Sequence, residues 1–248
     1  MREFEQMELE WFCKDDISDK TFEYWIKHRM QFYTFLKVNP AKLRVEKHKD
    51  NDLAHYSTAC SDIEYQFPFG WKELEGIAHR GTFDLTQHSK HSGKDLTVFD
   101  EETKTSYTPT VIESSVGLDR LFLMLITDAY CEDEIEGTKR TVLKLHPLIA
   151  PYTATFMPLT NKLSEKAFTL FAHYKQQGIN VDFDQSGSIG KRYRRQDEIG
   201  TPFCITYDFE TEQDNCVTIR ERDTTHQERV KIEELTTYIN KKIQEQIG

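Results

Sequence analysis

Residues 111–120 read VIESSVGLDR, a stretch whose pattern changes from that of a strand to that of a helix. A strand is expected over 107–113, and helical spacing begins at Val116. The apolar residues that continue this helical spacing are Leu118, Leu121, Phe122, Leu125 and Ile126. Gly117 marks the junction, where a backbone without a side chain can approach a ligand closely. Arg120, near the helix start, is suited to bind a phosphate, although the junction alone indicates a ligand site only weakly.

A charged strand precedes this junction. It is expected over 71–78 and is separated from the next strand by a hydrophilic hairpin or loop insertion at 86–105. The strand sets out Glu73 and Glu75 and is followed by Arg80, an arrangement that suggests a charged cleft. A surface ion pair is the simpler explanation of the same residues.

The amino-terminal segment also has the alternation of a strand. Over 3–13, one face carries Phe4, Gln6, Glu8 and Glu10 and the other carries Glu5, Met7, Leu9 and Trp11. A helix is expected over 19–37, with an apolar stripe that belongs to the core. Glu8 and Glu10 either face a ligand or lie on an exposed strand, and the pattern does not decide between the two. This front part indicates an α+β fold with a largely antiparallel sheet.

The acidic run at 132–136, followed by Gly137, is expected to break the chain. The domain boundary is therefore expected near 132–141, which gives domains at 1–138 and 139–248. In the second part we expect strands at 142–149, 179–183, 203–209 and 216–222, and helices at 162–177, 190–199 and 226–247. Such alternation predicts a compact α/β domain with a mixed sheet.

Composition indicates an ordinary globular protein. The 248 residues are 38% hydrophobic and 30% charged, and no apolar run approaches the length of a membrane span. The five cysteines are scattered without a CxxC pair, and the acidic amino terminus is unlike a secretion signal, so a reducing, cytoplasmic location is expected. No Walker, Rossmann, HExxH or GxSxG motif is present, so a nucleotide site here has to be of another kind.

The net charge of −10 argues against nonspecific nucleic-acid binding. Residues 141–248 hold 14 Lys and Arg against 15 Asp and Glu, so residues 1–140 hold 18 against 27 and carry most of the negative charge. A local basic cluster in the second part consists of Lys191, Arg192, Arg194 and Arg195. This cluster could meet phosphates, and a solvated basic turn balanced by Asp197 and Glu198 explains it equally well.

Four motifs together resemble the carboxy-terminal part of class II glycyl-tRNA synthetases. They are REFEQMELE at 2–10, ELEGIAHR at 73–80, VIESSVGLDR at 111–120 and SGSIGKRYRRQDEIGTPF at 186–203. The resemblance implies an incomplete class II catalytic domain with an antiparallel sheet, followed by a class IIa anticodon-binding domain. It implies formation of glycyl-adenylate from glycine and ATP with Mg²⁺, then transfer of glycine to its tRNA, by a homodimer in the full-length family.

The resemblance also implies site residues, with none assigned as acid, base or nucleophile. The implied glycine-binding residues are Phe4, Gln6, Glu8, Arg80, Glu113 and Ser115. The implied ATP-binding residues are Arg2, Glu3, Phe4, Glu73, Leu74, Gly117, Leu118, Asp119 and Arg120, with Mg²⁺ reached through Glu73. By this resemblance, Phe4 would stack on adenine, Arg80 would bind the glycine carboxylate or its adenylate, and Arg120 would bind the terminal phosphates of ATP. The basic cluster is the implied tRNA contact.

Two departures from the family pattern bear on activity. Ser114 stands where the family usually has proline, which bears on the geometry of the pocket. The family also begins well before residue 1, so the first class motif and an ATP-binding arginine lie outside this sequence. The chain alone is therefore expected to activate glycine poorly or not at all. An alternative is a catalytically inactive module that binds tRNA or another RNA.

Overall fold

The structure, a computed structural model, describes residues 4–49, 53–54, 56–135 and 137–247. The chain divides into two compact units, Met1–Asp128 and Ala129–Gly248. This division falls earlier than the boundary expected near 132–141. The acidic run does not break the chain but forms strand β8 (Tyr130–Ile135), which pairs with β9 (Thr138–Leu143) as a hairpin of the second unit.

The first unit is built on an antiparallel sheet of five strands in the order β1-β7-β4-β3-β2. These strands are β1 (Gln6–Cys13), β2 (Leu43–Lys47), β3 (Ala59–Phe67), β4 (Gly70–Gly81) and β7 (Thr110–Gly117). The helices of the unit are α1 (Ser18–Phe35), α2 (Phe83–Ser92) and α3 (Leu118–Ala129), with 3-10 turns at Asp15–Ile17 and Pro40–Lys42. The antiparallel sheet and the strand-to-helix junction at Gly117 are confirmed, whereas β2 and β3 were not predicted.

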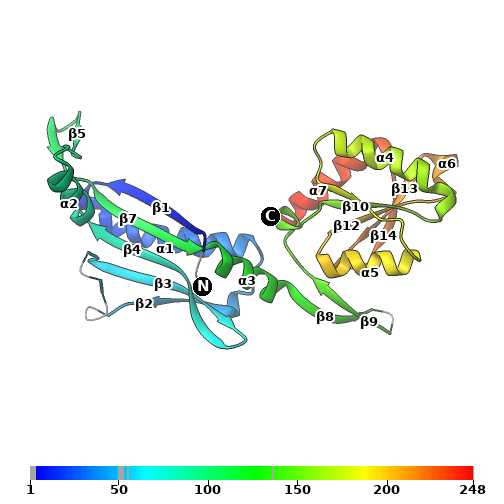
Figure 1. Cartoon of the computed structure of the whole chain (residues 1–248), viewed down its shortest axis with the longest axis horizontal. Helices are drawn as coiled ribbons and strands as arrows, with labels where there is room; N and C mark the ends of the chain where they lie inside the picture. The colour runs from blue at the N-terminus through cyan, green and yellow to red at the C-terminus, as the bar shows by residue number, and fades with distance from the viewer. Residues whose placement is uncertain (1–3, 50–52, 55, 136, 248) are drawn as a thin grey trace. The chain divides into compact units, whose positions relative to one another are not determined.

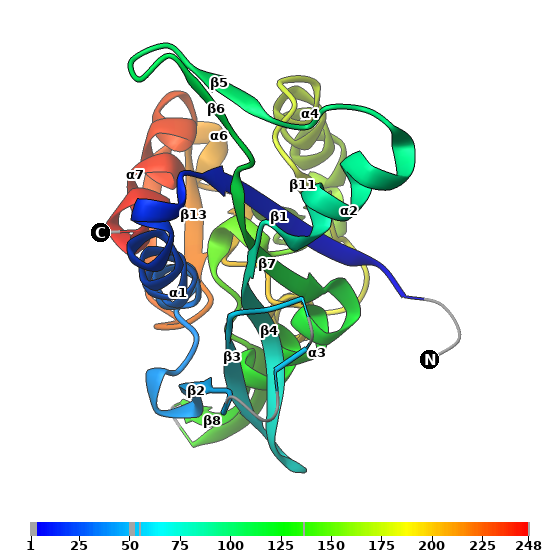
Figure 2. The same ribbon diagram turned by 90° about the vertical axis from the view of Figure 1, so that its left-hand side faces the viewer.

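Helix α1 covers one face of this sheet (Figures 1 and 2). Its apolar stripe supplies core residues as expected, and Phe22, Trp25, Ile26 and Tyr33 are buried. The stretch expected as a hairpin or loop insertion contains most of α2 and leads into a small ribbon of β5 (Val98–Asp100) and β6 (Thr105–Tyr107), which extends beyond the sheet (Figure 1).

The second unit has a mixed sheet of five strands in the order β11-β10-β12-β13-β14. The strands are β10 (Ala154–Pro158), β11 (Val181–Phe183), β12 (Phe203–Tyr207), β13 (Cys216–Glu221) and β14 (Gln227–Lys231). The helices are α4 (Ser164–Gln176), α5 (Ile189–Ile199), α6 (Thr211–Asp214) and α7 (Leu235–Ile247), with 3-10 turns at Pro147–Ile149, Asn161–Leu163 and Ile232–Glu234. Strands β11, β10 and β12 run parallel, and β13 and β14 are antiparallel, so the predicted mixed sheet is confirmed.

Helices cover both faces of this second sheet (Figure 1). On one face α4 and α7 bury Phe171 and Leu235 against strand residues such as Phe156 and Ile205. On the other face α5 ends at Gly200, whose φ of 86° suits glycine and stops the helix as expected.

Two expectations for the second unit are wrong. Residues 142–149 do not form one strand, because β9 ends at Leu143 and Pro147 opens a 3-10 turn; the central strand β10 follows later. The final helix does not start at 226, because residues 227–231 pair with β13 as β14 and the helix begins at Leu235. Pairing with a neighbouring strand here overrides local helical propensity. Among the described helices, none has both the length and the apolar character that a membrane crossing needs.

Candidate active site

The register of β1, β7 and β4 places the predicted polar residues in two rows across the sheet. Glu8 lies opposite Ser115, which lies opposite Gly76. In the next row Glu10 lies opposite Glu113, which lies opposite Ala78. Because directly paired residues share a sheet face, these carboxylates and the Ser115 hydroxyl all lie on one face.

A β-bulge in β4 determines which acids of ELEGIAHR reach this face. Glu75 pairs with Ile63 and Glu73 pairs with Glu64, so Leu74 is the extra residue. Glu73 is exposed and shares a face with Gly76, whereas Glu75 points to the opposite face and is fully buried. The expectation that Glu73 and Glu75 both face the charged cleft is therefore wrong. Leu74 is 1% exposed, so its side chain is not available to contact ATP.

The polar face of the sheet holds a cavity of about 240 Å³. Its lining includes Glu73, Arg80, Glu113 and Ser115, with Gly76 and Ala78 among the strand residues beneath them. The structure thus brings four of the predicted site residues together from β4 and β7. The small residues leave room at the sheet surface, since a Cβ added at Gly76 would lie 3.8 Å from Asp62 Oδ1 and 3.9 Å from Glu73 Oε1.

Arg80 is the cation of this cavity. Its Nη1 donates to Glu113 Oε2 at 3.0 Å and its Nε donates to Asp84 Oδ2 at 2.6 Å. The guanidinium also stacks on Tyr56, 4.3 Å from the ring centre. These contacts fix the planar group in one orientation, and the hydrogen bond to Asp84 raises the pKa of Arg80.

The acids of the cavity outnumber its cations. Burial raises the pKa of Glu113, the nearby Arg80 opposes this, and the charges of Glu8 and Glu10 add to it. Asp62 and Glu73 also line the cavity. An acidic pocket with one oriented guanidinium is suited to a small zwitterion, because the acids attract an ammonium group and the guanidinium binds a carboxylate.

The remaining predicted residues of β1 lie beside this cavity and not in its lining. Gln6 donates to the Ser115 hydroxyl, and Glu8 is exposed on the same face. Phe4 precedes β1 and is 63% exposed, so its ring lies largely open to solvent. Arg2 and Glu3 lie outside the described residues.

A second cavity of about 450 Å³ lies at the start of α3. Its lining includes Phe67, Phe69, Lys72, Glu73, Asp119 and Arg120. Arg120 Nη1 donates to the Glu73 carbonyl at 2.8 Å and lies 3.6 Å from the Glu73 carboxylate. Glu73 therefore lines both cavities. Leu118 is also exposed at this helix start, next to Gly117. An aromatic wall beside cationic side chains is suited to a nucleobase and its phosphates.

A buried polar network, which the sequence did not reveal, lies behind the first cavity. Arg29 Nε donates to Glu75 Oε1 at 2.5 Å, and the Tyr33 and Ser114 hydroxyls donate to the same carboxylate. Burial, with the nearby Glu75 carboxylate, raises the pKa of Tyr33, so this phenol stays protonated. Ser114, the departure from the family pattern, thus has a structural role: it ties β7 to β4 between the site residues Glu113 and Ser115.

The basic cluster of the second unit is not one surface. Arg192 is 2% exposed, and it donates to the Gly187 carbonyl at 3.0 Å and to the Pro158 carbonyl. Burial lowers its pKa. The expectation that Arg192 contacts tRNA is therefore wrong, because its guanidinium is enclosed by backbone carbonyls of its own unit.

The other basic residues line an open cavity of about 760 Å³ in the second unit. Its lining includes Lys191, Tyr193, Arg194, Arg195, Glu198 and Arg220. Arg195 is held by Asp184 at 2.7 Å, and Arg220 stacks on Tyr193 at 4.9 Å. Cationic groups around an aromatic ring are suited to bases and phosphates of a single strand.

We expect Arg192→Met to lower the free energy of unfolding of the second unit by about 1–3 kcal/mol, because the buried Pro158 carbonyl and the Gly187 carbonyl lose their donor. The matched control is Lys191→Met at the exposed neighbouring position, which should change the free energy of unfolding by less than about 0.5 kcal/mol. Denaturant unfolding of each variant measures both. Equal stability of the two variants would contradict the structural role of Arg192.

Comparison with known proteins finds close relatives among glycine–tRNA ligases. Over 98% of its length the chain is 53% identical to the glycine–tRNA ligase of Geobacillus thermodenitrificans, and 51% identical to those of Caldanaerobacter subterraneus and Clostridium tetani. The resemblance to glycyl-tRNA synthetases is confirmed. The chain spans about half of these relatives, 52% of each.

The domain order of the chain agrees with this family. Residues 153–242 match the family described as an anticodon binding domain. A solved prolyl-tRNA synthetase from Cryptosporidium parvum, complexed with L-proline and AMP, has a TM-score of 0.69 at 16% identity. The match covers 99% of this chain and 51% of that one. At this identity the likeness shows the fold alone: a class II synthetase sheet followed by an anticodon-binding domain.

Proposed function

We propose that the chain provides one wall of the active site and the anticodon-binding domain of a glycine–tRNA ligase. The observation that carries this proposal is the acidic cavity on the first sheet, in which Arg80 is oriented by Glu113 and Asp84. Arg80 binds the glycine carboxylate, while Glu113 and the neighbouring acids hold its ammonium group. The identity to glycine–tRNA ligases supports this assignment.

Selectivity for glycine follows from a pocket that is too narrow for a side chain. A pocket that fits a larger amino acid rejects glycine only weakly, because the missing methyl group lowers the binding free energy by only about 1–3 kcal/mol. Rejection of alanine by steric clash is stronger. The strand residues Gly76 and Ala78 and the acids around them form such a pocket only when the opposite wall is present.

ATP binds in the second cavity in this proposal, with Arg120 on its terminal phosphates and Mg²⁺ reached through Glu73. Glu73 lines both cavities, so it lies where amino acid and nucleotide meet. The glycine carboxylate then attacks the α-phosphate in line, and pyrophosphate leaves. Position and charge neutralisation drive this step without a protein nucleophile.

The second unit recognises glycine tRNA. Lys191, Arg194 and Arg195 neutralise phosphates, and Tyr193 offers an aromatic surface to an unpaired base.

The five cysteines are free, in keeping with a reducing, cytoplasmic location. The complete enzyme is proposed to be a homodimer, as the family resemblance implies.

The test is glycine-dependent ATP–pyrophosphate exchange by a chimera in which this chain replaces its counterpart in the Geobacillus relative. We expect the chimera to catalyse exchange, and the isolated 248-residue chain to be slower by about 100-fold or more, because oriented groups that bind ATP are then absent. A folded chimera that binds tRNA without exchange would favour the alternative, an inactive RNA-binding module. Comparable exchange by the isolated chain would contradict the claim that it holds only one wall.

A further inference from the structure

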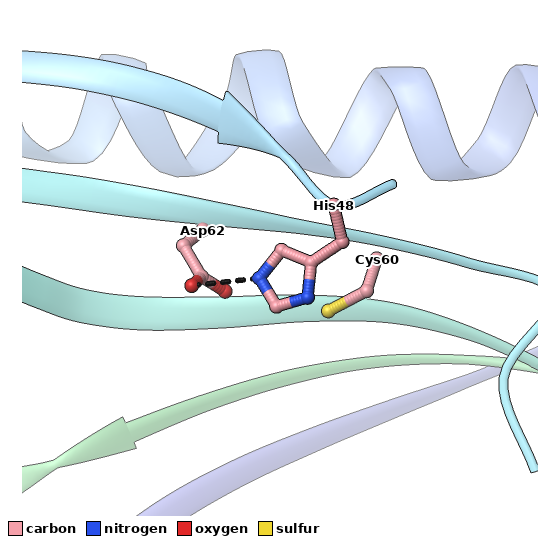
Figure 3. Close-up of side chains that lie close together, drawn as sticks. All are labelled: His48, Cys60 and Asp62. Atoms are coloured by element: carbon pink, nitrogen blue, oxygen red, sulfur yellow. Dashed lines mark hydrogen bonds and ion pairs between the residues drawn. The ribbon is translucent and has the colours of Figure 1, made fainter. Parts of the chain in front are cut away.

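Three potential metal ligands meet at the junction of β2 and β3. Cys60 and Asp62 are two residues apart in β3 and share one sheet face, while His48 follows β2. The His48 amide donates to the Cys60 carbonyl at 3.0 Å, which fixes the backbone of His48 beside β3. Figure 3 shows the imidazole between the other two side chains, with His48 Nε2 2.9 Å from Asp62 Oδ2.

The distances between these groups suit one cation. One nitrogen, one sulfur and one carboxylate oxygen lie within 4.8 Å of one another. In a tetrahedral zinc site, bonds of about 2.0–2.3 Å place ligand atoms about 3.3–3.8 Å apart. Figure 3 shows the second ring nitrogen of His48 beside the Cys60 sulfur, so closure of the cluster around one ion requires the imidazole to turn until one nitrogen faces both partners. The strands that carry the ligands need not change.

The ligand types select the class of metal. Imidazole nitrogen and thiolate sulfur suit zinc and related borderline cations, whereas magnesium takes oxygen ligands. Three protein ligands leave a fourth position to water or to a group that enters the pocket. Glu73 and Glu113 line the same cavity and add negative charge, which favours a cation. Arg80 lines it too, and its positive charge partly offsets theirs.

We propose that His48, Cys60 and Asp62 bind one zinc-like divalent cation in the wall of the first cavity. This site does not depend on the proposed aminoacylation, because its ligands and its test belong to the chain alone. The simpler arrangement is a His48–Asp62 ion pair beside an uninvolved thiol, and binding measurements separate the two.

The test uses the untagged 248-residue chain, stripped with a chelator and titrated with Zn²⁺ and with Co²⁺. We expect one zinc per chain by elemental mass spectrometry, and a thiolate-to-cobalt charge-transfer band. Cys60→Ser should abolish that band and weaken zinc binding by at least about tenfold, the lower end of the loss caused by removing an outer-shell partner. Cys216→Ser, a partly buried cysteine of the second unit, is the matched control and should leave both unchanged.

His48→Gln provides a second variant that keeps a polar side chain at the junction, and circular dichroism checks that each variant is folded. His48→Gln should weaken zinc binding as much as Cys60→Ser does, and it should reduce the thiolate-to-cobalt band. Absence of stoichiometric zinc in the folded parent chain would overturn the proposal. So would a cobalt–thiolate band that persists in folded Cys60→Ser, because the thiolate would then come from another cysteine.

Discussion

Asp197→Asn should lower the free energy of unfolding of the second unit by about 3–5 kcal/mol, the cost of leaving buried charges without their partner. Asp197 is fully buried and accepts two hydrogen bonds from Arg220, at 2.8 and 3.0 Å. Arg140 and Arg194 lie 3.3 and 3.2 Å from the same carboxylate. Asparagine keeps the shape of the side chain and removes the charge that these guanidiniums share.

Asp184→Asn is the matched control for this prediction. Asp184 also pairs with an arginine, Arg195, at 2.7 Å, but that arginine side chain is 43% exposed. An exposed pair contributes about 0–1 kcal/mol, so this variant should unfold near the parent midpoint. Urea unfolding monitored by circular dichroism compares the stabilities of the two variants. Equal losses in both variants would show that Asp197 is not the centre of the arginine network.

Arg80→Met should lower kcat/KM for glycine in ATP–pyrophosphate exchange by about 10²–10³-fold in the chimera with the Geobacillus relative. The guanidinium is oriented by Glu113 and Asp84, and methionine removes both its charge and its fork of donors. The loss should appear largely as a raised KM for glycine, because Arg80 binds the substrate carboxylate before and during attack.

Arg44→Met provides the control for this change. Arg44 also pairs with a carboxylate, Glu64, and stacks on an aromatic ring, Trp71, at 4.5 Å. It lines neither cavity of the first unit. Exchange should therefore stay within about twofold of the parent, which corresponds to the small effect of surface substitutions. If both variants lose activity equally, Arg80 has no particular role in binding glycine.

Periodicity predicted those parts of the fold in which apolar and polar residues alternate with the period of the element. The stripe of α1 and the alternation of β1 were visible in the sequence because apolar and polar residues follow the period of each element. Strand β14 was assigned to the final helix, since its charged residues gave no sign of pairing with β13. Such pairing joins distant parts of the chain and leaves little local signal.

The candidate site was predicted in part for similar reasons. Glu113 and Arg80 were singled out from the sequence, and the structure places them 3.0 Å apart. Glu73 and Glu75 were expected on one face, but the bulge at Leu74 puts them on opposite faces, and the sequence pattern does not show this bulge. Arg192 looked like its exposed neighbours, although its guanidinium binds carbonyls within the unit. A charge cluster does not show which of its members face inward.

The most direct test of the account is the amino-acid dependence of ATP–pyrophosphate exchange by the chimera. The cavity on the first sheet is assigned to glycine, so exchange should require glycine and should be at least about 100-fold slower with alanine or serine at equal concentration, because a side chain clashes with the pocket. Exchange that proceeds equally well with alanine, or that depends on another amino acid, would contradict the assignment.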